Sequence, residues 1–398
     1  MADETRKTIR ALAVTDRGVE NVLVSEIEEI VGAKALALDS CASFESSIDD
    51  VLKFTYLTQA SDRVMVLLGG FKFEGLDDLL EKTKESLKGA NLSEWFPKGY
   101  PDCSFKVTCE RRGLHDFGSQ GVEPEIGGLI IEAVKRDSGF EPRVDLKDSD
   151  VTVFLFINND LAHVGIDLAG RDLSKRTYRI FSGPGTVNAK IAFAMSRIAG
   201  YKKKLKMIDL YARTGIIPIE AALHESGFSV NFHAKDFSFK KLPSLKERDW
   251  DSFFRKIDSK RSDEKLDITG FDPLLRNVEA SNKNAKLAGI DKLIRFSKMD
   301  LEWMDVKLDE NTVDLVVSRI PCPSSHQAEA TVRKAYKELF HQAEYFLKSG
   351  GKLCVLGENL SLLQEMITKD FKLKDEERLW AGQMEYELVI LCRVEKVE

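Results

Sequence analysis

One stretch near the middle of the chain, residues 206–222 (KMIDLYARTGIIPIEAA), constrains the fold more than any other. Met207, Ile208 and Leu210 read as a buried strand, which a tight turn joins to a helix opening near Pro218. Proline suits the first helical turn, because its fixed φ fits a helix and its missing N–H has no partner there. Strand–turn–helix units of this kind direct backbone N–H groups and a helix N-terminus toward a nucleotide-like ligand.

The turn itself departs from the glycine-rich pattern that such ligands favour. Its sequence is Ala212-Arg213-Thr214-Gly215, so a single glycine remains where two are usual. A side chain with a positive charge at Arg213 would crowd a ligand, and a non-glycine residue adopts positive φ only at a cost. The shape of a cofactor site is predicted here with part of its chemistry missing.

From residue 205 onward, strands alternate with helices, which predicts a mostly parallel sheet. We expect strands at 205–210, 266–271, 293–298, 313–318 and 352–357, a further strand near 229–232, and a terminal hairpin over 373–380 and 385–393. The first 72 residues instead follow a split βαβ order, which is typical of a small ferredoxin-like α+β module. A chain of 398 residues is long enough for two or three such domains.

Composition narrows the class of protein. No apolar run approaches the roughly 20 residues of a membrane helix, and the charged start MADETRKTIR has no apolar signal core. The six cysteines form no C-x-x-C pair, which favours reduced thiols in a cytoplasmic protein and predicts no metal site. A net charge of −6 and a pI near 5.8 count mildly against a protein coated in nucleic acid, yet allow a local basic patch.

Two regions resemble one known family. Residues 105–179 are similar to a THUMP domain in the stretches FKVTCERRGLHDFGSQ, IGGLIIEAV, VDLKDSDVTVFLFINND and GIDLAGRDLSKRTYR. Residues 181–398 resemble the catalytic domain of THUMP-containing tRNA guanine-N2-methyltransferases, through GPGTVNAKIAFAM, IIPIEAA and the insertion KLPSLKERDW. The chain looks like a divergent member with degraded cofactor and catalytic motifs.

The resemblance implies an α/β fold in four parts. A ferredoxin-like domain would cover 1–73, a THUMP RNA-binding domain 74–170, a basic linker 171–185, and a Rossmann-like methyltransferase domain 186–398, whose seven-stranded sheet ends in an antiparallel hairpin. It also implies that the N-terminal half grips the acceptor end of tRNA. The residues expected to contact RNA are Arg111, Arg112, His115, Phe117, Ser119, Lys175, Arg176 and Arg179.

The resemblance further implies S-adenosylmethionine as the methyl donor, bound by four residues. Asp209 ends the first strand near the methionine part of the donor, and Gly215 keeps one position of close approach. Asp272, in TGFDP, would accept both ribose hydroxyls, and Asp300 would contact the adenine amine. Taken alone, Asp272 and Asp300 could equally be solvated carboxylates at strand ends.

The expected catalytic loop is the most altered part. In the family, an Asn or Asp, two prolines and an aromatic residue follow this strand, so that carbonyl groups accept hydrogen bonds from the guanine amine and the ring stacks on the base. Here Ser318 precedes Arg319, Ile320, Pro321 and Cys322. Arginine only donates hydrogen bonds and cannot accept from an amine. Cys322 is read as a buried thiol rather than a new nucleophile.

Two hypotheses follow, with a third as a weaker option. The first is an active tRNA methyltransferase with an unorthodox loop. The second is a catalytically inactive tRNA-binding protein or partner subunit that keeps the fold. Both Arg213 and the loop favour the second hypothesis, whereas the prevailing activity of the family favours the first. The third is methylation of an atom other than an amine. The direction of the Arg213 side chain helps to distinguish these hypotheses. If the side chain fills the methionine pocket, the domain has lost its donor site. If the side chain turns outward, the donor can still bind.

Overall fold

The computed structural model describes residues 8–183, 185–325 and 327–394, which fold into two compact units. Unit 1 contains the described residues before Asp16 together with Leu23–Leu173 and Lys235–Ile257. Unit 2 contains Asp16–Val22, Ser174–Ala234 and the described residues from Asp258 onward. Each unit is therefore assembled from stretches that are far apart in the sequence.

The first part of unit 1 has the predicted ferredoxin-like topology. Four antiparallel strands pair in the order β2-β3-β1-β4. Ser47 begins α2, where its hydroxyl accepts a hydrogen bond from the Asp50 N–H and caps the helix. The elements are β1 (Thr8–Val14), α1 (Glu20–Val31), β2 (Ala35–Leu38), β3 (Cys41–Ser47), α2 (Ile48–Leu57) and β4 (Arg63–Lys72).

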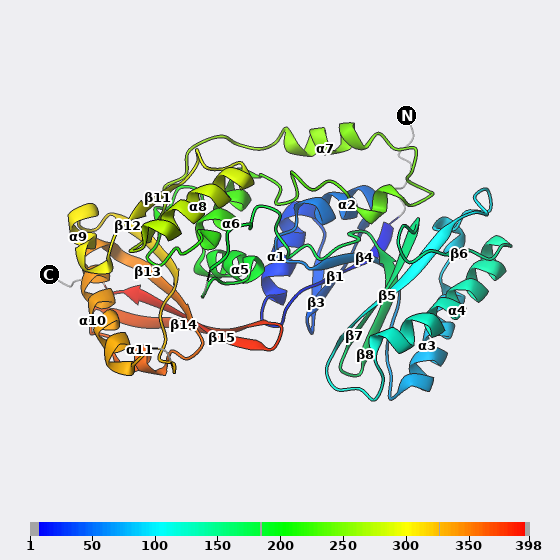
Figure 1. Ribbon diagram of the computed structural model, residues 1–398, viewed down its shortest axis with the longest axis horizontal. Coiled ribbons are helices and arrows are strands. Elements are labelled where there is room, and N and C mark those ends of the chain that lie inside the picture. Colours follow the sequence, from blue (N-terminus) through cyan, green and yellow to red (C-terminus); the bar gives the residue numbers. More distant parts are fainter. Residues whose placement is uncertain (1–7, 184, 326, 395–398) are drawn as a thin grey trace. The chain divides into compact units, whose positions relative to one another are not determined.

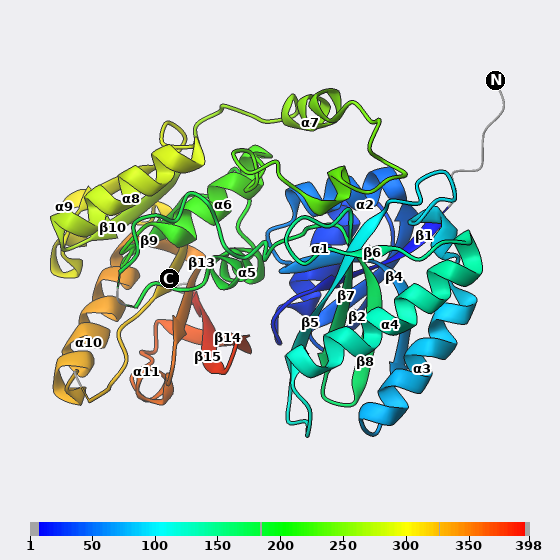
Figure 2. The ribbon, with the colours of Figure 1, turned by 45° about the vertical axis from the view of Figure 1, so that its right-hand side comes forward.

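The sheet continues beyond β4 without a break. Strand β8 pairs with β4, and the order then runs β8-β7-β5-β6, which gives one eight-stranded sheet. Helices α3 and α4 pack together beside this part of the sheet (Figure 2). The two modules expected on either side of residue 73 thus share a single sheet. The elements are α3 (Leu76–Gly89), β5 (Ser104–Arg112), α4 (Ser119–Ser138), β6 (Arg143–Val144), β7 (Val151–Asn158) and β8 (Leu161–Asp167).

A segment from the C-terminal half completes unit 1. It contains a short 3-10 turn (Ser238–Lys240) and α7 (Trp250–Asp258). The Phe237 and Phe254 rings pack on Tyr56 of α2, at centroid separations of 6.1 and 4.8 Å. The Ser238 hydroxyl donates to the Asp167 carbonyl at the end of β8, 2.6 Å away. These contacts bury an aromatic cluster that neither stretch could bury alone.

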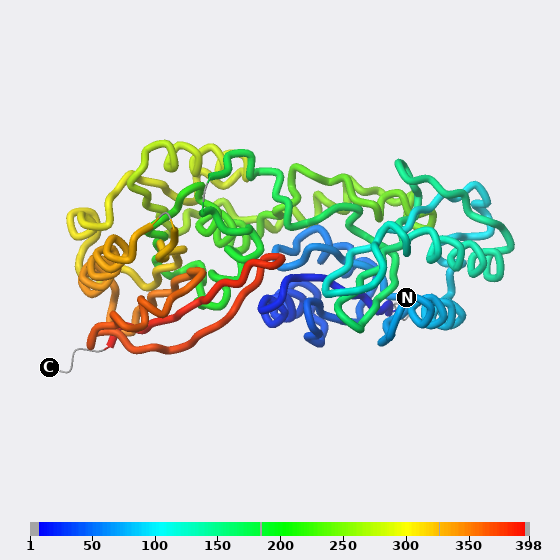
Figure 3. The backbone as a smooth tube through the Cα atoms, turned by 60° about the horizontal axis from the view of Figure 1, so that its bottom comes forward, coloured from blue at the N-terminus to red at the C-terminus, as the bar shows by residue number. Residues whose placement is uncertain are grey.

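Unit 2 is built on the predicted seven-stranded sheet (Figure 1). Its order is β11-β10-β9-β12-β13-β15-β14, parallel except for β15, which is antiparallel to both neighbours and forms the terminal hairpin with β14 (Figure 3). The strands are β9 (Met207–Asp209), β10 (Ile268–Asp272), β11 (Arg295–Lys298), β12 (Val313–Arg319), β13 (Leu347–Gly357), β14 (Phe371–Ala381) and β15 (Met384–Arg393).

Helices pack on this sheet in two groups. In the first group, α6 contacts both α5 and α8. In the second, α10 contacts both α9 and α11. The stretch near 229–232, expected as a strand, is instead a run of turns, because the Asn231 N–H donates to the Ser229 hydroxyl at 3.0 Å. The helices are α5 (Ala189–Ala199), α6 (Ile216–Ser226), α8 (Leu275–Ala288), α9 (Met304–Lys307), α10 (Glu329–Phe346) and α11 (Ser361–Glu365).

Within the described ranges, none of the helices combines the length and apolar character that crossing a membrane requires.

Candidate functional site

The carboxyl ends of β9, β10 and β12 form the candidate site of unit 2. Strand β9 lies between β10 and β12, so the strand order reverses at this point. Open α/β sheets bind ligands outside the carboxyl ends of their strands at such a reversal. Asp209 ends β9, Asp272 ends β10, and Ser318 is the penultimate residue of β12. The fold therefore brings together three residues that the sequence analysis singled out separately.

Asp209 is the most perturbed carboxylate of this edge. One oxygen, Oδ1, accepts from the Ser318 hydroxyl at 2.6 Å and from the Tyr211 N–H at 3.1 Å. The other, Oδ2, is buried and has no hydrogen-bond partner among the described residues. Burial raises the pKa of Asp209 to about 7, against the hydrogen bonds that favour its charged form. An orphaned, buried carboxylate oxygen of this kind suits a ligand that donates a hydrogen bond.

Arg213 lies in the turn that follows β9 with a φ of 50°. This left-handed conformation is uncommon for a residue with a side chain. Its backbone N–H donates to Asp272 Oδ2 at 2.9 Å, and its side-chain Nη1 donates to the Gly185 carbonyl. The guanidinium also fills the space that a Cβ on Gly185 would occupy, with Cζ only 2.8 Å from that position. The side chain therefore runs from the turn to the segment that precedes α5.

Asp272 and Asp300 are placed very differently. Asp272 is 3% exposed, and its Oδ1 accepts from the Leu274 N–H and from Asn277 Nδ2, both at 2.9 Å. With the Arg213 N–H on Oδ2, three of its roughly four acceptor positions are taken. Asp300 is exposed just beyond β11, and its side chain makes no capping hydrogen bond to the turn that follows.

Gly215 serves the packing of the sheet and helices. It adopts a φ of 79° where α6 begins, which glycine accepts without strain. A Cβ at this position would meet the Phe296 ring at 2.7 Å and the Ser281 side chain at 2.9 Å. The same ring blocks a Cβ on Gly270 of β10. Phe296 thus occupies the space beside the turn, which nothing in the sequence pattern indicated.

The loop after β12 is fixed in position by its neighbours. Arg319 Nη2 donates to Glu358 Oε1 at 2.6 Å, and the guanidinium lies 5.3 Å from the centroid of Tyr386. The Arg319 side chain is only 15% exposed, and Ile320 is buried. At the position where we expected the acceptor of an amine-methylating loop, the structure places a cation that is already paired.

The rest of this loop packs against α10 and β13. The Tyr336 hydroxyl donates to the Pro321 carbonyl at 2.7 Å, so this carbonyl already has a partner. Cys322 Sγ lies 3.9 Å from the same hydroxyl and fills the space beside Gly357, where a Cβ would meet it at 2.5 Å. Burial raises the pKa of Tyr336, so the phenol stays protonated and donates. Cys322 is a half-buried packing residue, close to the buried thiol that we expected.

Unit 1 holds a compact cluster of a cation and three rings. Arg111, at the end of β5, donates from Nη1 to His115 Nδ1 at 3.0 Å. The His115 Nε2 lies 2.7 Å from the Asn159 carbonyl. Since arginine only donates, Nδ1 accepts in this contact and Nε2–H donates to the carbonyl. The ring stacks on Phe73 at 5.9 Å and contacts Phe117 at 5.2 Å.

The cluster leaves one donor of Arg111 without a partner among the described residues. Its guanidinium lies 5.8 Å from the Phe117 centroid, and its buried Nε has no hydrogen-bond partner among the described residues. Ser119 begins α4 nearby in sequence and hydrogen-bonds the Cys109 thiol. Phe73 also belongs to the cluster, although no motif in the sequence pointed to it, because its position beside His115 depends on the pairing of β4 with β8.

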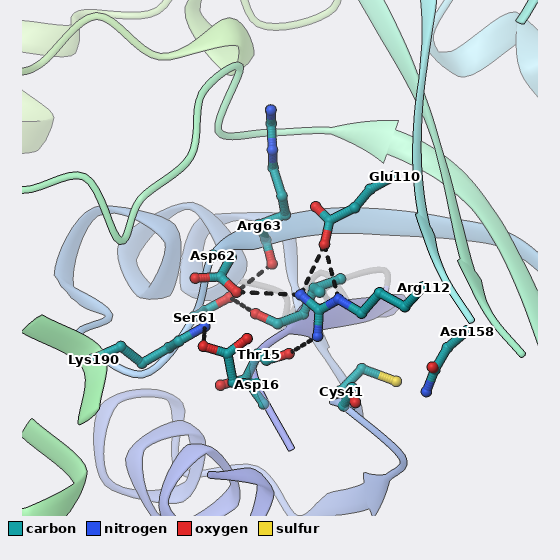
Figure 4. Close-up of polar contacts among 12 residues, drawn as sticks. Thr15, Asp16, Cys41, Ser61, Asp62, Arg63, Glu110, Arg112, Asn158 and Lys190 are labelled. Atoms are coloured by element: carbon teal, nitrogen blue, oxygen red, sulfur yellow. Dashed lines mark hydrogen bonds and ion pairs between the residues drawn. The ribbon is translucent and has the colours of Figure 1, made fainter. Parts of the chain in front are cut away.

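Arg112 has a different role from its neighbour Arg111. Figure 4 shows its guanidinium held by Glu110, Asp62 and the Thr15 carbonyl. The ion pairs measure 2.8 Å to Glu110 and 3.5 Å to Asp62. The Arg112 side chain therefore points into unit 1, where it links β5 to the residue that precedes β4.

Arg176 is inaccessible to phosphate. Its side chain is 1% exposed and donates to both carboxylate oxygens of Glu220, at 2.9 and 3.2 Å. The Tyr178 hydroxyl donates to the same carboxylate at 2.5 Å. Lys175 is exposed and Arg179 is half-buried, and both belong to unit 2 rather than to the unit that holds Arg111.

Comparisons with known proteins agree with this architecture. Residues 176–385 match the family model of the RMKL-like methyltransferase domain, and residues 76–167 match the THUMP domain. The chain is 25% identical over 372 residues to tRNA (guanine(6)-N2)-methyltransferase of Methanocaldococcus jannaschii. The matched residues cover 92% of this chain and 95% of that protein. It is 26% identical to the enzyme of the same name from Archaeoglobus fulgidus, over 87% of this chain and 83% of that one.

Solved structures show the same fold along the whole chain. TrmN from Thermus thermophilus superposes with a TM-score of 0.68 at 20% identity, covering 98% of this chain and 100% of that one. SMU.472, crystallised with SAH, superposes with a TM-score of 0.78 at 20% identity, covering 99% and 100%. The matched domain spans more than half of the sequence. The chain therefore belongs to the RMKL-like methyltransferase domain family and carries a THUMP domain ahead of that domain.

Proposed function

We propose that this protein binds tRNA through unit 1, at the acceptor-end region of the tRNA, and that the Arg111 cluster is part of the contact surface. The observation that carries this proposal is the hydrogen bond from Arg111 to His115 Nδ1, which holds the guanidinium beside Phe117. A fixed guanidinium next to aromatic rings can pair with a phosphate while a ring stacks on an unpaired base. The THUMP domain and the tRNA-acting relatives support the same ligand.

The test is the salt dependence of tRNA binding. Labelled, unmodified tRNA is titrated with the full chain at several KCl concentrations, and the slope of log K against log salt counts the phosphate contacts. Arg111→Ala should weaken binding and reduce the slope by about one. Lys135→Ala is the matched control, because Lys135 is exposed near the far end of α4, about 24 Å along the helix from Ser119.

Competition by fragments of tRNA tests whether unit 1 binds the acceptor-end region. An acceptor-stem minihelix with its 3′ single strand should compete with whole tRNA, and the same minihelix without that strand should compete less well, because the rings lose the bases on which they stack. Equal competition by an anticodon stem-loop would contradict this assignment. A slope unchanged by Arg111→Ala, with affinity equal to the Lys135→Ala control, would remove the Arg111 cluster from the contact surface.

Methyl transfer from S-adenosylmethionine to a tRNA guanine amine is the activity that the names of the relatives favour. Asp209 fits a methyl donor with a cationic group, because its buried Oδ2 has no hydrogen-bond partner among the described residues and can accept from such a group. The other residues do not fit: Arg213 extends over Gly185, and Asp272 has three acceptor positions filled. No reaction step is therefore assigned to this edge.

A tRNA-binding protein that does not transfer methyl groups is the second candidate, and Arg319 favours it. This side chain is paired with Glu358 and has no acceptor to offer a guanine amine. The assay is transfer of radiolabel from S-adenosylmethionine to unmodified tRNA. Sustained turnover would contradict the second candidate and leave tRNA binding intact, whereas tRNA binding without turnover would support it.

A further inference from the structure

We infer that the Arg213 side chain, which crosses from the turn after β9 to the segment before α5, blocks the binding of S-adenosylmethionine at the carboxyl ends of β9 and β10, and that removing this one side chain allows the donor to bind. The inference goes beyond the proposed function and takes the identity of the donor from the family to which unit 2 belongs. It concerns donor binding at unit 2 and is independent of tRNA binding by unit 1.

The position of Arg213 is the first argument. It lies in the turn directly after β9, at the reversal of strand order where ligands of open α/β sheets bind. Its φ of 50° is one that glycine adopts freely and that other residues adopt under strain. The backbone of this turn thus keeps the path that a glycine would follow, and the side chain is an addition to it.

The contacts of Arg213 are the second argument. Its N–H donates to Asp272, and its carbonyl accepts from the Ser281 hydroxyl at 3.1 Å, so the backbone is fixed to β10 and α8. The guanidinium reaches Gly185, on the segment before α5. The side chain therefore crosses the space between these two segments, and a ligand that enters the turn from the strand ends would meet it.

Charge is the third argument. Burial lowers the pKa of Arg213 and Arg319 acts in the same direction, while Asp209 and Asp272 raise it. The two carboxylates thus interact electrostatically with a guanidinium that is part of the chain. S-adenosylmethionine would bring a sulfonium and an ammonium group to carboxylates that already have a cation nearby, and like charges at short range repel. Arg213 therefore opposes the donor by its charge as well as by its position between the turn and Gly185.

The experiment compares donor binding by three forms of the full chain. Calorimetric titration with S-adenosylmethionine is carried out on the wild type, on Arg213→Gly and on Arg213→Lys. The glycine variant should fold at least as well as the wild type, because glycine suits the observed φ. The lysine variant is the matched control, since it keeps a long cationic side chain on the same backbone.

We expect Arg213→Gly to bind the donor roughly tenfold or more tightly than either the wild type or Arg213→Lys. Two results would overturn the inference: equal affinity of the wild type and Arg213→Gly, or affinity of Arg213→Lys equal to that of Arg213→Gly. Titration of the same preparations with tRNA tests the proposed function separately. Failure of all three forms to bind tRNA would contradict the proposed function. The comparison of their affinities for S-adenosylmethionine would still be valid.

Discussion

The buried triad of Arg176, Glu220 and Tyr178 gives the sharpest test of unit 2. Glu220 and Arg176 side chains are 0% and 1% exposed, and three hydrogen bonds converge on the one carboxylate. Glu220→Ala would take from a buried guanidinium the carboxylate that accepts two of its hydrogen bonds, which costs about 3–5 kcal/mol. The stranded Tyr178 hydroxyl adds about 1–3 kcal/mol. Since the two terms share a partner, we expect a total loss of about 4–6 kcal/mol rather than their full sum.

The assay is native-state hydrogen exchange of the full chain, read in peptides from β9 and α6. Exchange reports the free energy of opening unit by unit, so unit 1 does not mask the result. Glu365→Ala, which removes an exposed partner of Arg333, is the control and should leave protection unchanged. Glu220→Gln keeps one acceptor and should lose less protection. A loss below about 1 kcal/mol in Glu220→Ala would refute the buried geometry.

The same triad decides what Arg176 does. Replacing all three residues together, as Arg176→Met, Glu220→Leu and Tyr178→Phe, removes the buried charges and the hydroxyl that pairs with them. This triple variant should fold and keep the wild-type salt slope for tRNA binding. A slope reduced by about one would mean that Arg176 contacts a phosphate, contrary to its burial in the structure.

Three further outcomes follow from the contacts described. The pKa of Asp209 is about 7 in the folded protein and near 3.8 in the unfolded chain. Between these two pH values the folded state therefore binds more protons than the unfolded state. The stability of unit 2 should then fall as pH rises from about 4 to about 7, and Asp209→Asn should abolish that fall in exchange experiments. Phe254→Ala should destabilise α2 of unit 1 by about 3–5 kcal/mol, measured by exchange, whereas the less buried Phe253 should tolerate alanine better. Arg112→Ala should lower unit 1 stability by about 1–3 kcal/mol and leave the salt slope unchanged, the reverse of Arg111→Ala.

The conflict between the family and this chain is confined to one edge of one sheet. The strands, their order and the orphaned oxygen of Asp209 are those of a domain built to hold a ligand there. The side chains of Arg213 and Arg319 put two cations at the same edge. A scaffold can persist while its chemistry changes, because the sheet is stabilised by its core and not by the residues at its strand ends.

The sequence by itself determined the architecture of both halves. Alternation of strands and helices after residue 205 predicted a parallel sheet with a terminal hairpin, and the split βαβ order predicted the ferredoxin-like start. These patterns are local, because burial of one face repeats every two residues in a strand and every 3.6 in a helix. The altered turn at Arg213 and the altered loop at Arg319 could also be read directly, because each lies at a fixed offset from a recognisable strand.

Only the tertiary structure decided which charged residues are available. Arg111 and Arg112 are adjacent in sequence, yet one borders a ring cluster and the other is paired with Glu110 and Asp62. Arg176 reads as part of a basic stretch and is buried against Glu220 on α6. The return of residues 235–257 to unit 1 depends likewise on partners that are distant in sequence. Sequence patterns specify which face of an element is buried, whereas pairing, burial and the direction of a long side chain depend on what the fold brings beside it.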